Sequence, residues 1–211
     1  MSAPSRTLLL SNPDALTERL AALERPHMVP LNGYAARLRK THGGVPHFDP
    51  FDGGAESRLL VLLETPGPSA ALVRFTSRDN PTGTAGNLRM LFESARISRT
   101  ATALWNAVPW TLPRRDGRLG KPSAADLAAA LAELPELLAM FPELKIVLLM
   151  GRTAAAFAGD VAAIAPNVAV FKTAHPSPTF VNTSPLIRTA LEATFVEAAH
   201  LLRHVDRPGI R

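Results

Sequence analysis

The sequence contains no cysteine, and it has few aromatic side chains: two Trp, one Tyr and nine Phe among 211 residues. Without thiols the chain forms no disulfide bond and holds no iron–sulfur cluster, and we predict neither a metal nor another cofactor. No apolar run approaches the roughly 18 residues of a membrane span. The Leu8-Leu9-Leu10 triplet is too short for the core of a signal peptide. These absences predict a cytoplasmic protein without a membrane partner.

The residues that are present suit a folded domain with a polyanionic partner. Hydrophobic residues make up 46% of the chain, which is enough for a sizeable core. Lys and Arg number 23 against 18 Asp and Glu, a formal net charge of +5. Many folded domains carry such a charge, so it supports nucleic-acid binding without establishing it.

Four short apolar runs, each bounded by turn-forming residues, are typical of buried strands. They are Leu59–Leu63, Ala103–Val108, Ile146–Met150 and Val168–Phe171. Helical segments separate these runs. This order predicts an α/β fold with a four-stranded, mainly parallel sheet, flanked by helices on both faces and joined by right-handed crossovers. In such a sheet the ligand crevice lies at the carboxyl ends of the strands, so the residues after each run are the first site candidates.

The clearest helix is predicted from Ala124 to Met140, because Ser123 can cap it together with Asp126 three residues later. Pro135 lies inside this segment, and we expect it to kink the helix or to split it into two. Further helices are expected after residues 83–86 and over residues 186–203.

Residues 1–44 are predicted to form an N-terminal helical extension. It has an amphipathic stretch from Ala15 to Leu23 and a basic stretch around Arg37, Arg39 and Lys40. The α/β domain is expected over residues 45–205, followed by a tail over residues 206–211.

Three polar side chains follow predicted strands: Glu64, Asn106 and His175. Glu64 either faces the crevice, or caps a helix or pairs with an arginine. Asn106 offers a donor and an acceptor side by side, which matches the edge of a pyrimidine such as uracil, although such an amide also satisfies loop backbone groups. A neutral His175 can donate to an oxygen that gains negative charge as a bond breaks, and a purely structural histidine is the alternative.

The segments around these residues, taken in order, resemble the uracil-DNA glycosylase superfamily. His175-Pro176-Ser177-Pro178 is identical to the second motif of that family, and Leu104–Val108 resembles its uracil-reading strand. Glu64-Thr65-Pro66-Gly67 resembles the Glu-x-Pro-Gly first motif of bacterial branches. Residues 146–157 resemble the strand and Gly-x-x-Ala turn between the two. The ordered set covers about residues 45–202 and carries the resemblance.

The resemblance implies an enzyme that flips a base out of DNA and hydrolyses its N-glycosidic bond by water attack on the sugar. His175 would stabilise the charge on the departing base, and Asn106 would bind the base edge. Phe75 is the candidate for stacking on the base, with Phe48 and Phe51 as alternatives. A core position for Phe75 fits its residue type equally well.

The resemblance also implies DNA contacts at the rim of the crevice. Ser177, Thr179 and Phe180 lie in the loop after His175. Thr179 and Phe180 lie where the family places a wedge that fills the gap left by the flipped base, and Phe180 is the better plug by size. A second loop carries cations that suit phosphate binding, with a merely solvated loop as the alternative. These cations are Arg114, Arg115, Arg118 and Lys121.

The first motif departs from the best-known branch of the family at two positions. That branch has an aspartate that orients the water, whereas this chain has Thr65, which cannot act as a strong base. We expect Glu64 to contribute to catalysis directly, with backbone groups placing the water as the alternative. That branch also excludes thymine with a tyrosine, whereas this chain has Gly67, so hypoxanthine, xanthine or a mismatched pyrimidine join uracil as candidate substrates. The absence of cysteine places the resemblance in a cluster-free branch.

Asn80 precedes a predicted helix in a segment, residues 79–86, that resembles one in related bacterial sequences. The resemblance assigns Asn80 to the lining of the base pocket. The alternative is a simple turn in which the Thr84 hydroxyl caps the helix.

The sequence therefore predicts a monofunctional DNA glycosylase of base excision repair that releases uracil or a related deaminated base. We expect DNA as its partner, no bound cofactor, and a nucleoid-associated monomer. The alternative is a catalytically inactive protein that binds damaged or single-stranded DNA. An unrelated α/β hydrolase is disfavoured because the chain has no Gly-x-Ser-x-Gly elbow.

Overall fold

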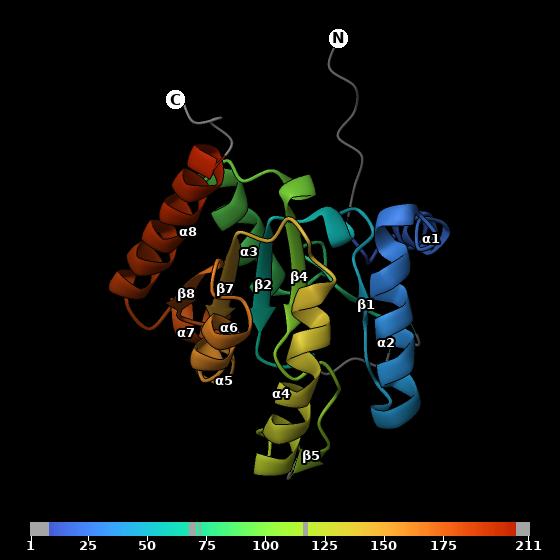
Figure 1. Ribbon diagram of the computed structural model, residues 1–211. Helices are drawn as coiled ribbons and strands as arrows, with labels where there is room; N and C mark the ends of the chain where they lie inside the picture. Colours follow the sequence, from blue (N-terminus) through green and yellow to red (C-terminus); the bar gives the residue numbers. More distant parts are fainter. Residues whose placement is uncertain (1–8, 68–70, 72, 116–117, 206–211) are drawn as a thin grey trace.

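The computed structural model in Figure 1 describes residues 9–67, 71, 73–115 and 118–205. Its centre is a sheet of four parallel strands in the order β4-β2-β7-β8. These strands are β2 (Leu59–Leu63), β4 (Thr102–Asn106), β7 (Ile146–Met150) and β8 (Ala169–Thr173). They are the four predicted apolar runs, with ends displaced by no more than two residues. The sheet and its flanking helices confirm the predicted fold class.

Helices connect the strands and cover the sheet. The longer ones are α1 (Pro13–Ala21), α2 (Val29–His42), α3 (Gly83–Ser94), α4 (Ala124–Ala139) and α8 (Pro185–Val205). The shorter ones are α5 (Arg152–Ala155), α6 (Ala158–Ile164) and α7 (Pro178–Val181), with 3₁₀ turns at Pro26–Met28, Gly54–Glu56 and Arg99–Ala101. The predicted tail, residues 206–211, lies outside the described residues.

Two small sheets accompany the central one. In the first, β1 (His47–Phe48) pairs in parallel with β3 (Phe75–Thr76). In the second, β5 (Arg114–Arg115) pairs with the antiparallel β6 (Arg118–Leu119). The sequence did not reveal them, because two-residue strands leave no periodic pattern.

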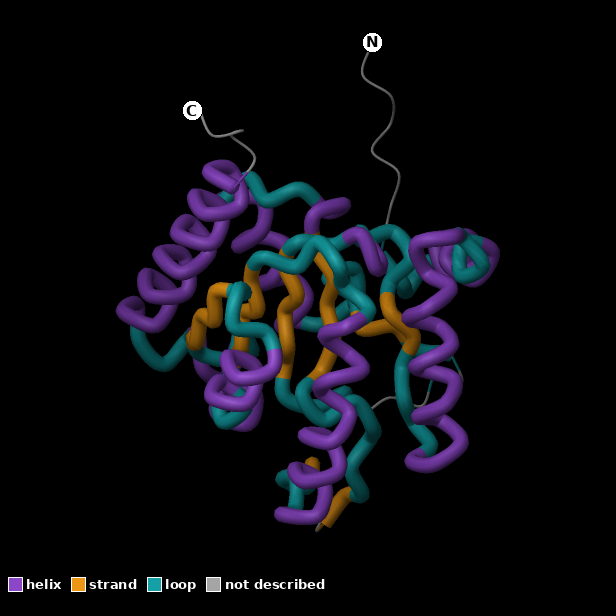
Figure 2. Tube along the Cα trace, viewed as in Figure 1, coloured by secondary structure: helices purple, strands orange, loops and turns teal. Residues whose placement is uncertain are grey.

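The two faces of the central sheet bury separate groups of apolar side chains, because successive residues of a strand point to opposite faces. On one face, Leu60, Leu62 and Trp105 pack with residues of α2 and α4. On the other face, Leu59 and Val61 pack with residues of α3 and α8. Figure 2 shows the purple helices on both sides of the orange strands. Coverage of both faces explains why the two central strands, β2 and β7, are apolar throughout instead of alternating.

Helix α4 begins as the sequence predicts, but it does not divide. Ser123 and Asp126 form the predicted capping box. The helix continues through Pro135, so of the two expected effects, a kink or a split, the split does not occur. Pro135 is exposed, whereas Leu134 and Leu138 beside it are buried in the core. Burial of these side chains outweighs the one backbone hydrogen bond that a proline removes.

Helix α2 is part of the main core. Its Leu31 is fully buried in the same apolar cluster as Trp105. Arg37, from the basic stretch, forms ion pairs with Glu133 and Glu136 of α4. The N-terminal helices therefore pack against the α/β domain through both apolar and polar contacts.

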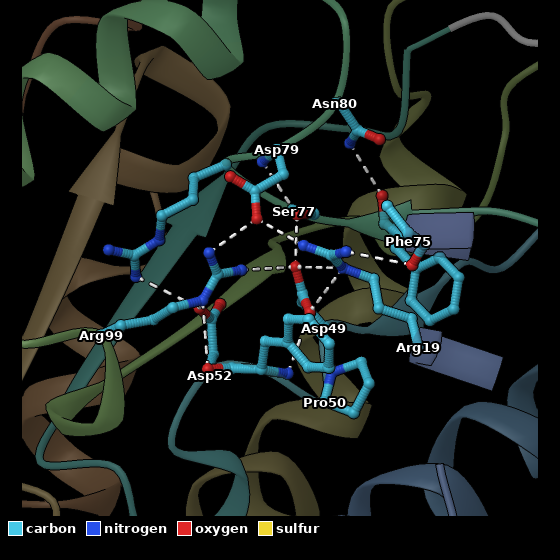
Figure 3. Close-up of polar contacts among 12 residues, drawn as sticks. Arg19, Asp49, Pro50, Asp52, Phe75, Ser77, Asp79, Asn80 and Arg99 are labelled. Carbon is cyan, nitrogen blue, oxygen red and sulfur yellow. Dashed lines mark hydrogen bonds and ion pairs between the residues drawn. The ribbon is translucent and has the colours of Figure 1, made fainter. Parts of the chain in front are cut away.

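A cluster of buried ion pairs joins α1 to the edge of the sheet where the strands begin (Figure 3). It contains three arginines and three aspartates: Arg19, Arg78, Arg99, Asp49, Asp52 and Asp79. Arg19 is fully buried, with Nε 3.1 Å from Asp49 Oδ1 and Nη2 bonded to Asp79. Arg99 contacts the same two carboxylates, at 2.7 Å and 2.6 Å. The hydrogen-bonded arginines and aspartates of the cluster are 20 to 60 residues apart in the sequence, so no local pattern revealed the cluster.

Asp52 is the least well satisfied carboxylate of this cluster. Its Oδ1 lies 3.0 Å from Arg99 Nε and 3.4 Å from Arg78 Nη2, yet neither of its oxygens accepts a well-directed hydrogen bond from the described residues. Burial raises the pKa of Asp52 to about 7, against the opposing effect of the arginines. Burial therefore favours the neutral carboxyl form of Asp52.

Replacement of Arg19 by alanine should strongly destabilise the protein, because it leaves the buried Asp49 and Asp79 carboxylates with fewer cationic partners. The expected loss in the free energy of unfolding is about 3–5 kcal/mol, measured by urea denaturation. Arg188→Ala, at an exposed position of α8, should change it by less than about 0.5 kcal/mol. Equal losses in the two variants would show that the cluster does not anchor α1.

Candidate active site

The four central strands end at one edge of the sheet, the lower edge in Figure 1. Leu63 lies opposite Asn106, and Met150 lies opposite Thr173. The backbone pairing extends beyond β2, since the Val108 N–H donates to the Glu64 carbonyl at 3.0 Å. The segments that follow the strands are thereby placed side by side.

Glu64 is held by one of its two carboxylate oxygens. Its Oε1 accepts the backbone N–H of Thr153 at 2.9 Å. Gly151, which precedes α5, has φ +94°, and a Cβ there would lie 2.7 Å from Glu64 Cδ. A side chain at position 151 would therefore displace Glu64. Within the described ranges Oε2 has no hydrogen-bond partner, so one oxygen positions the carboxylate and the other is available to a ligand.

His175 is half-buried, and its contacts select one neutral tautomer. Nδ1 accepts the backbone N–H of Ser177 at 3.2 Å, which assigns the proton of the neutral ring to Nε2. Burial lowers the pKa of His175 below its ordinary value, and the Glu64 carboxylate acts in the opposite direction. At neutral pH, His175 is therefore an uncharged ring with a donor at Nε2.

The loop that carries His175 packs against the start of α3. Asn87 Nδ2 donates to the Pro176 carbonyl at 2.8 Å. Gly83 lies so close to the Pro178 ring that no side chain fits there. The loop leads into α7, where Thr179 is exposed and Phe180 retains 44% of its accessible surface. A fixed histidine is thus followed by an aromatic side chain that projects into solvent.

Asn106 lies at the end of β4 and is only 3% exposed. Its Nδ2 donates to Thr76 Oγ1 at 3.2 Å. Thr76 is on β3, so this contact joins the small β1-β3 sheet to the edge of the central sheet where the strands end. The sequence did not single out Thr76, and no signal in the sequence distinguishes it from other threonines.

Phe75, the candidate stacking residue, is only 4% exposed and lies 5.5 Å from the His47 ring. Asn80 Nδ2 donates to the Phe75 carbonyl at 2.9 Å, as Figure 3 shows. Of the two alternative aromatics, Phe48 is stacked on a core tryptophan, with ring centroids 3.7 Å apart. Phe51 lies under the guanidinium of Arg19, in the buried ion cluster. Phe75 precedes Thr76, the hydrogen-bond partner of Asn106, and Phe48 lies opposite Thr76 on the neighbouring strand.

Asn80 is half-buried and precedes α3, but the cap of that helix is not Thr84. The Thr82 hydroxyl accepts the Ala85 N–H at 3.2 Å. Since the helix begins at Gly83, Thr84 already lies within its first turn. The expectation of a Thr84 cap is wrong.

Gly67 is exposed, and among the described residues other than its chain neighbours no atom lies within 4 Å of where a Cβ at this position would be. Its carbonyl accepts a hydrogen bond from Arg74, which also donates to Thr111 at 2.8 Å. Thr65 is half-buried. The first motif thus presents an anchored Glu64 and an open Gly67.

The cationic loop after β4 is described in part. The backbones of Arg114, Arg115 and Arg118 form the β5-β6 hairpin, and their side chains lie outside the described part of the structure. Lys121 is exposed. In Figure 1, β5 lies below the ends of the central strands. Asn106 ends β4, and Glu64 directly follows β2.

Two kinds of feature are missing from the described residues. No three His, Asp or Glu side chains there are grouped so that they would hold a metal ion. None of the described helices is long and apolar enough to cross a membrane.

Residues 50–200 match the family described as the uracil DNA glycosylase superfamily. The match covers more than half of the chain, so the protein belongs to this superfamily, whose members are DNA glycosylases. A search of curated protein sequences found no match.

Similar solved structures include SMUG2 of Pedobacter heparinus, which is 11% identical with a TM-score of 0.49. That match covers 71% of this chain and 77% of the other. A proposed uracil DNA glycosylase of Methanosarcina acetivorans is 16% identical with a TM-score of 0.44, covering 68% of this chain and 91% of the other. At these identities and scores, family membership rests on the sequence match alone.

Replacement of Glu64 by glutamine should lower the pKa of His175 further, because it removes the carboxylate that favours the imidazolium form. In the wild-type protein the His175 ring should titrate below its ordinary pKa of about 6.5, since burial disfavours the charged ring. An NMR titration of the ring proton at Cε1 measures both midpoints. Glu197→Gln, at an exposed position of α8, should leave the midpoint unchanged. A midpoint that rises in Glu64→Gln would contradict the proximity of the two groups.

Proposed function

We propose that the protein is a monofunctional DNA glycosylase that hydrolyses the N-glycosidic bond of uracil or a related deaminated base. The observation that carries this proposal is that Glu64, with one free carboxylate oxygen, and a neutral His175, with a donor at Nε2, follow strands that end at the same edge of the sheet. The strand that carries Asn106 ends at that edge too. A carboxylate and a hydrogen-bond donor of this kind serve the two ends of the same bond cleavage.

In the proposed reaction, Glu64 Oε2 holds a water molecule that attacks C1′ of the sugar. The bond between C1′ and the base nitrogen breaks, and its electron pair leaves with the base. The proton of the water passes to the Glu64 carboxylate. His175 donates from Nε2 to the O2 oxygen of the departing base, where the negative charge develops. The products are the free base and an abasic sugar.

Binding of the flipped base is assigned to Asn106, Phe75 and Asn80. Asn106 offers its free Oδ1 and one Nδ2 hydrogen to the base edge. Phe75 supplies a ring face, and Asn80 holds the backbone of Phe75 in place. Gly67 leaves room beside the base. Thr65 lies in the first motif and contributes no strong base.

Contacts to DNA are assigned to the rim of the crevice. The exposed Phe180 is a candidate wedge for the gap left by the flipped base, with Thr179 beside it and Ser177 at the start of α7. Phosphate contacts are assigned to the loop cations, which are Arg114, Arg115, Arg118 and Lys121. The net charge of +5 supports this assignment.

The wild-type protein should release uracil from oligonucleotides and leave abasic sites that break in hot alkali. His175→Ala should slow the release on the order of hundreds-fold, the scale of losing one group that stabilises developing charge. His27→Ala, whose ring contacts the Pro50 carbonyl instead, should retain the wild-type rate. Strands carrying uracil, hypoxanthine, xanthine or mismatched thymine are tested singly and in duplexes. If none of these bases is released while salt-dependent binding persists, the protein is an inactive DNA-binding relative.

Replacement of Gly67 by tyrosine should narrow the range of bases, because the side chain would occupy the open space beside the base. Release of mismatched thymine should fall about 10–200-fold relative to uracil, the range that one methyl-sized difference in a pocket provides. The ratio of single-turnover rates measures the effect. Gly159→Tyr, also at a position with open space, should leave the ratio unchanged. A constant ratio in Gly67→Tyr would show that residue 67 does not face the base.

A further inference from the structure

The Asn106 amide is held by Thr76, a residue to which the proposed reaction assigns no role. Nδ2 donates to Thr76 Oγ1 at 3.2 Å, and both residues are almost fully buried, at 3% and 6% exposure. Nδ2 has two hydrogens, so one remains for a ligand. Within the described ranges Oδ1 has no hydrogen-bond partner. The contact therefore leaves one acceptor and one donor of the amide unused.

The order of these two groups decides which base edge the amide can read. Uracil and hypoxanthine present an N–H beside a carbonyl oxygen, which requires Oδ1 opposite the N–H and Nδ2 opposite the carbonyl. Cytosine presents a bare ring nitrogen beside an amino group, which requires the amide rotated by 180°. A buried amide without an anchor can adopt either orientation. The contact with Thr76 occurs in the orientation that commits Nδ2 and leaves Oδ1 free.

Thr76 is itself held on both sides along β3. On one side, Asn80 donates to the Phe75 carbonyl at 2.9 Å. On the other side, the Ser77 hydroxyl donates to Asp49 in the buried ion cluster. Arg19 of α1 pairs with that same Asp49. Contacts therefore run from the N-terminal helix through the ion cluster to Ser77, and the residues on both sides of Thr76 are held in place.

We propose that Thr76 is a positioning residue that fixes the Asn106 amide in the orientation that reads an N–H beside a carbonyl oxygen. It acts through Asn106 and does not touch the base. This role rests on the proposed base excision and deepens it: the enzyme accepts bases with that edge and rejects cytosine. A hydroxyl group can accept or donate, so the proposal requires the Thr76 hydroxyl to act as the acceptor from Nδ2, as it does in the structure, with its own hydrogen directed away from Asn106.

The test compares Thr76→Val with Thr76→Ser on oligonucleotides that differ only in carrying uracil or cytosine. Single-turnover rates are measured with enzyme in excess, over hours for slow release. Thr76→Val should release uracil about tenfold more slowly than the wild type, the scale of one lost hydrogen bond. Its rate of cytosine release should not fall. Thr76→Ser, which keeps the hydroxyl, should recover to within about twofold of the wild type. If cytosine release is undetectable throughout, the uracil rate and the recovery by serine decide the outcome.

Thr102→Val is the matched control, because Thr102 is a fully buried threonine at the opposite end of the strand that carries Asn106. It should lower the melting temperature without changing the ratio of uracil to cytosine release. If Thr76→Val does not melt cooperatively, Thr76→Ala takes its place.

Suppose that the wild-type protein is active. If Thr76→Val then releases uracil at the wild-type rate, or if the valine and serine variants lose equal activity, the positioning role of Thr76 is overturned and the proposed function stands. A wild-type protein that releases no base would overturn the proposed function, and the positioning role with it. The two failures are therefore distinguished by the wild-type rate.

Discussion

The in-register parallel pairing of β2 with β4 and β7 is the constraint on which the site depends. Because the strands run in one direction and end together, Glu64, Asn106 and the His175 loop meet at one edge without long loops folding over the sheet. The stability of this arrangement comes from two apolar layers, one on each face, and not from the polar groups at the edge. The scaffold can therefore hold a carboxylate and an uncharged histidine close together, an arrangement that the polar groups alone would not maintain.

The buried ion cluster is a second constraint, and it acts on the other side of the molecule. Two arginines and three aspartates are buried there and Arg99 is partly exposed, so the cluster stabilises the fold only if the buried charges keep their partners. The cluster ties α1 to the residues that follow β1 and β3. Since Thr76 of β3 contacts Asn106 and the adjacent Ser77 contacts Asp49, the ion cluster and the end of β4 are linked through neighbouring residues.

In both Glu64 and His175, one polar atom is held by a backbone N–H and the other is left without a partner among the described residues. Glu64 keeps one oxygen on a backbone amide, and His175 keeps Nδ1 on another, so each presents a single free atom to a ligand. Burial holds the histidine neutral, whereas the carboxylate beside it limits that effect. A charged acceptor and a neutral donor are complementary to a reaction in which a proton is taken at one end and negative charge develops at the other.

The sequence by itself determined the fold class, the four strands and the positions of Glu64, Asn106 and His175 at strand ends, because apolar runs and turn residues are local signals. It did not determine that α4 continues through Pro135, since the packing of Leu134 and Leu138 decides that. Nor did it show the ion cluster or the Thr76 contact. Arg19 and Asp79 are 60 residues apart, and Thr76 and Asn106 are 30 apart. Pairings across such distances leave no local pattern, so tertiary structure alone decided which polar groups are anchored and which are free to act.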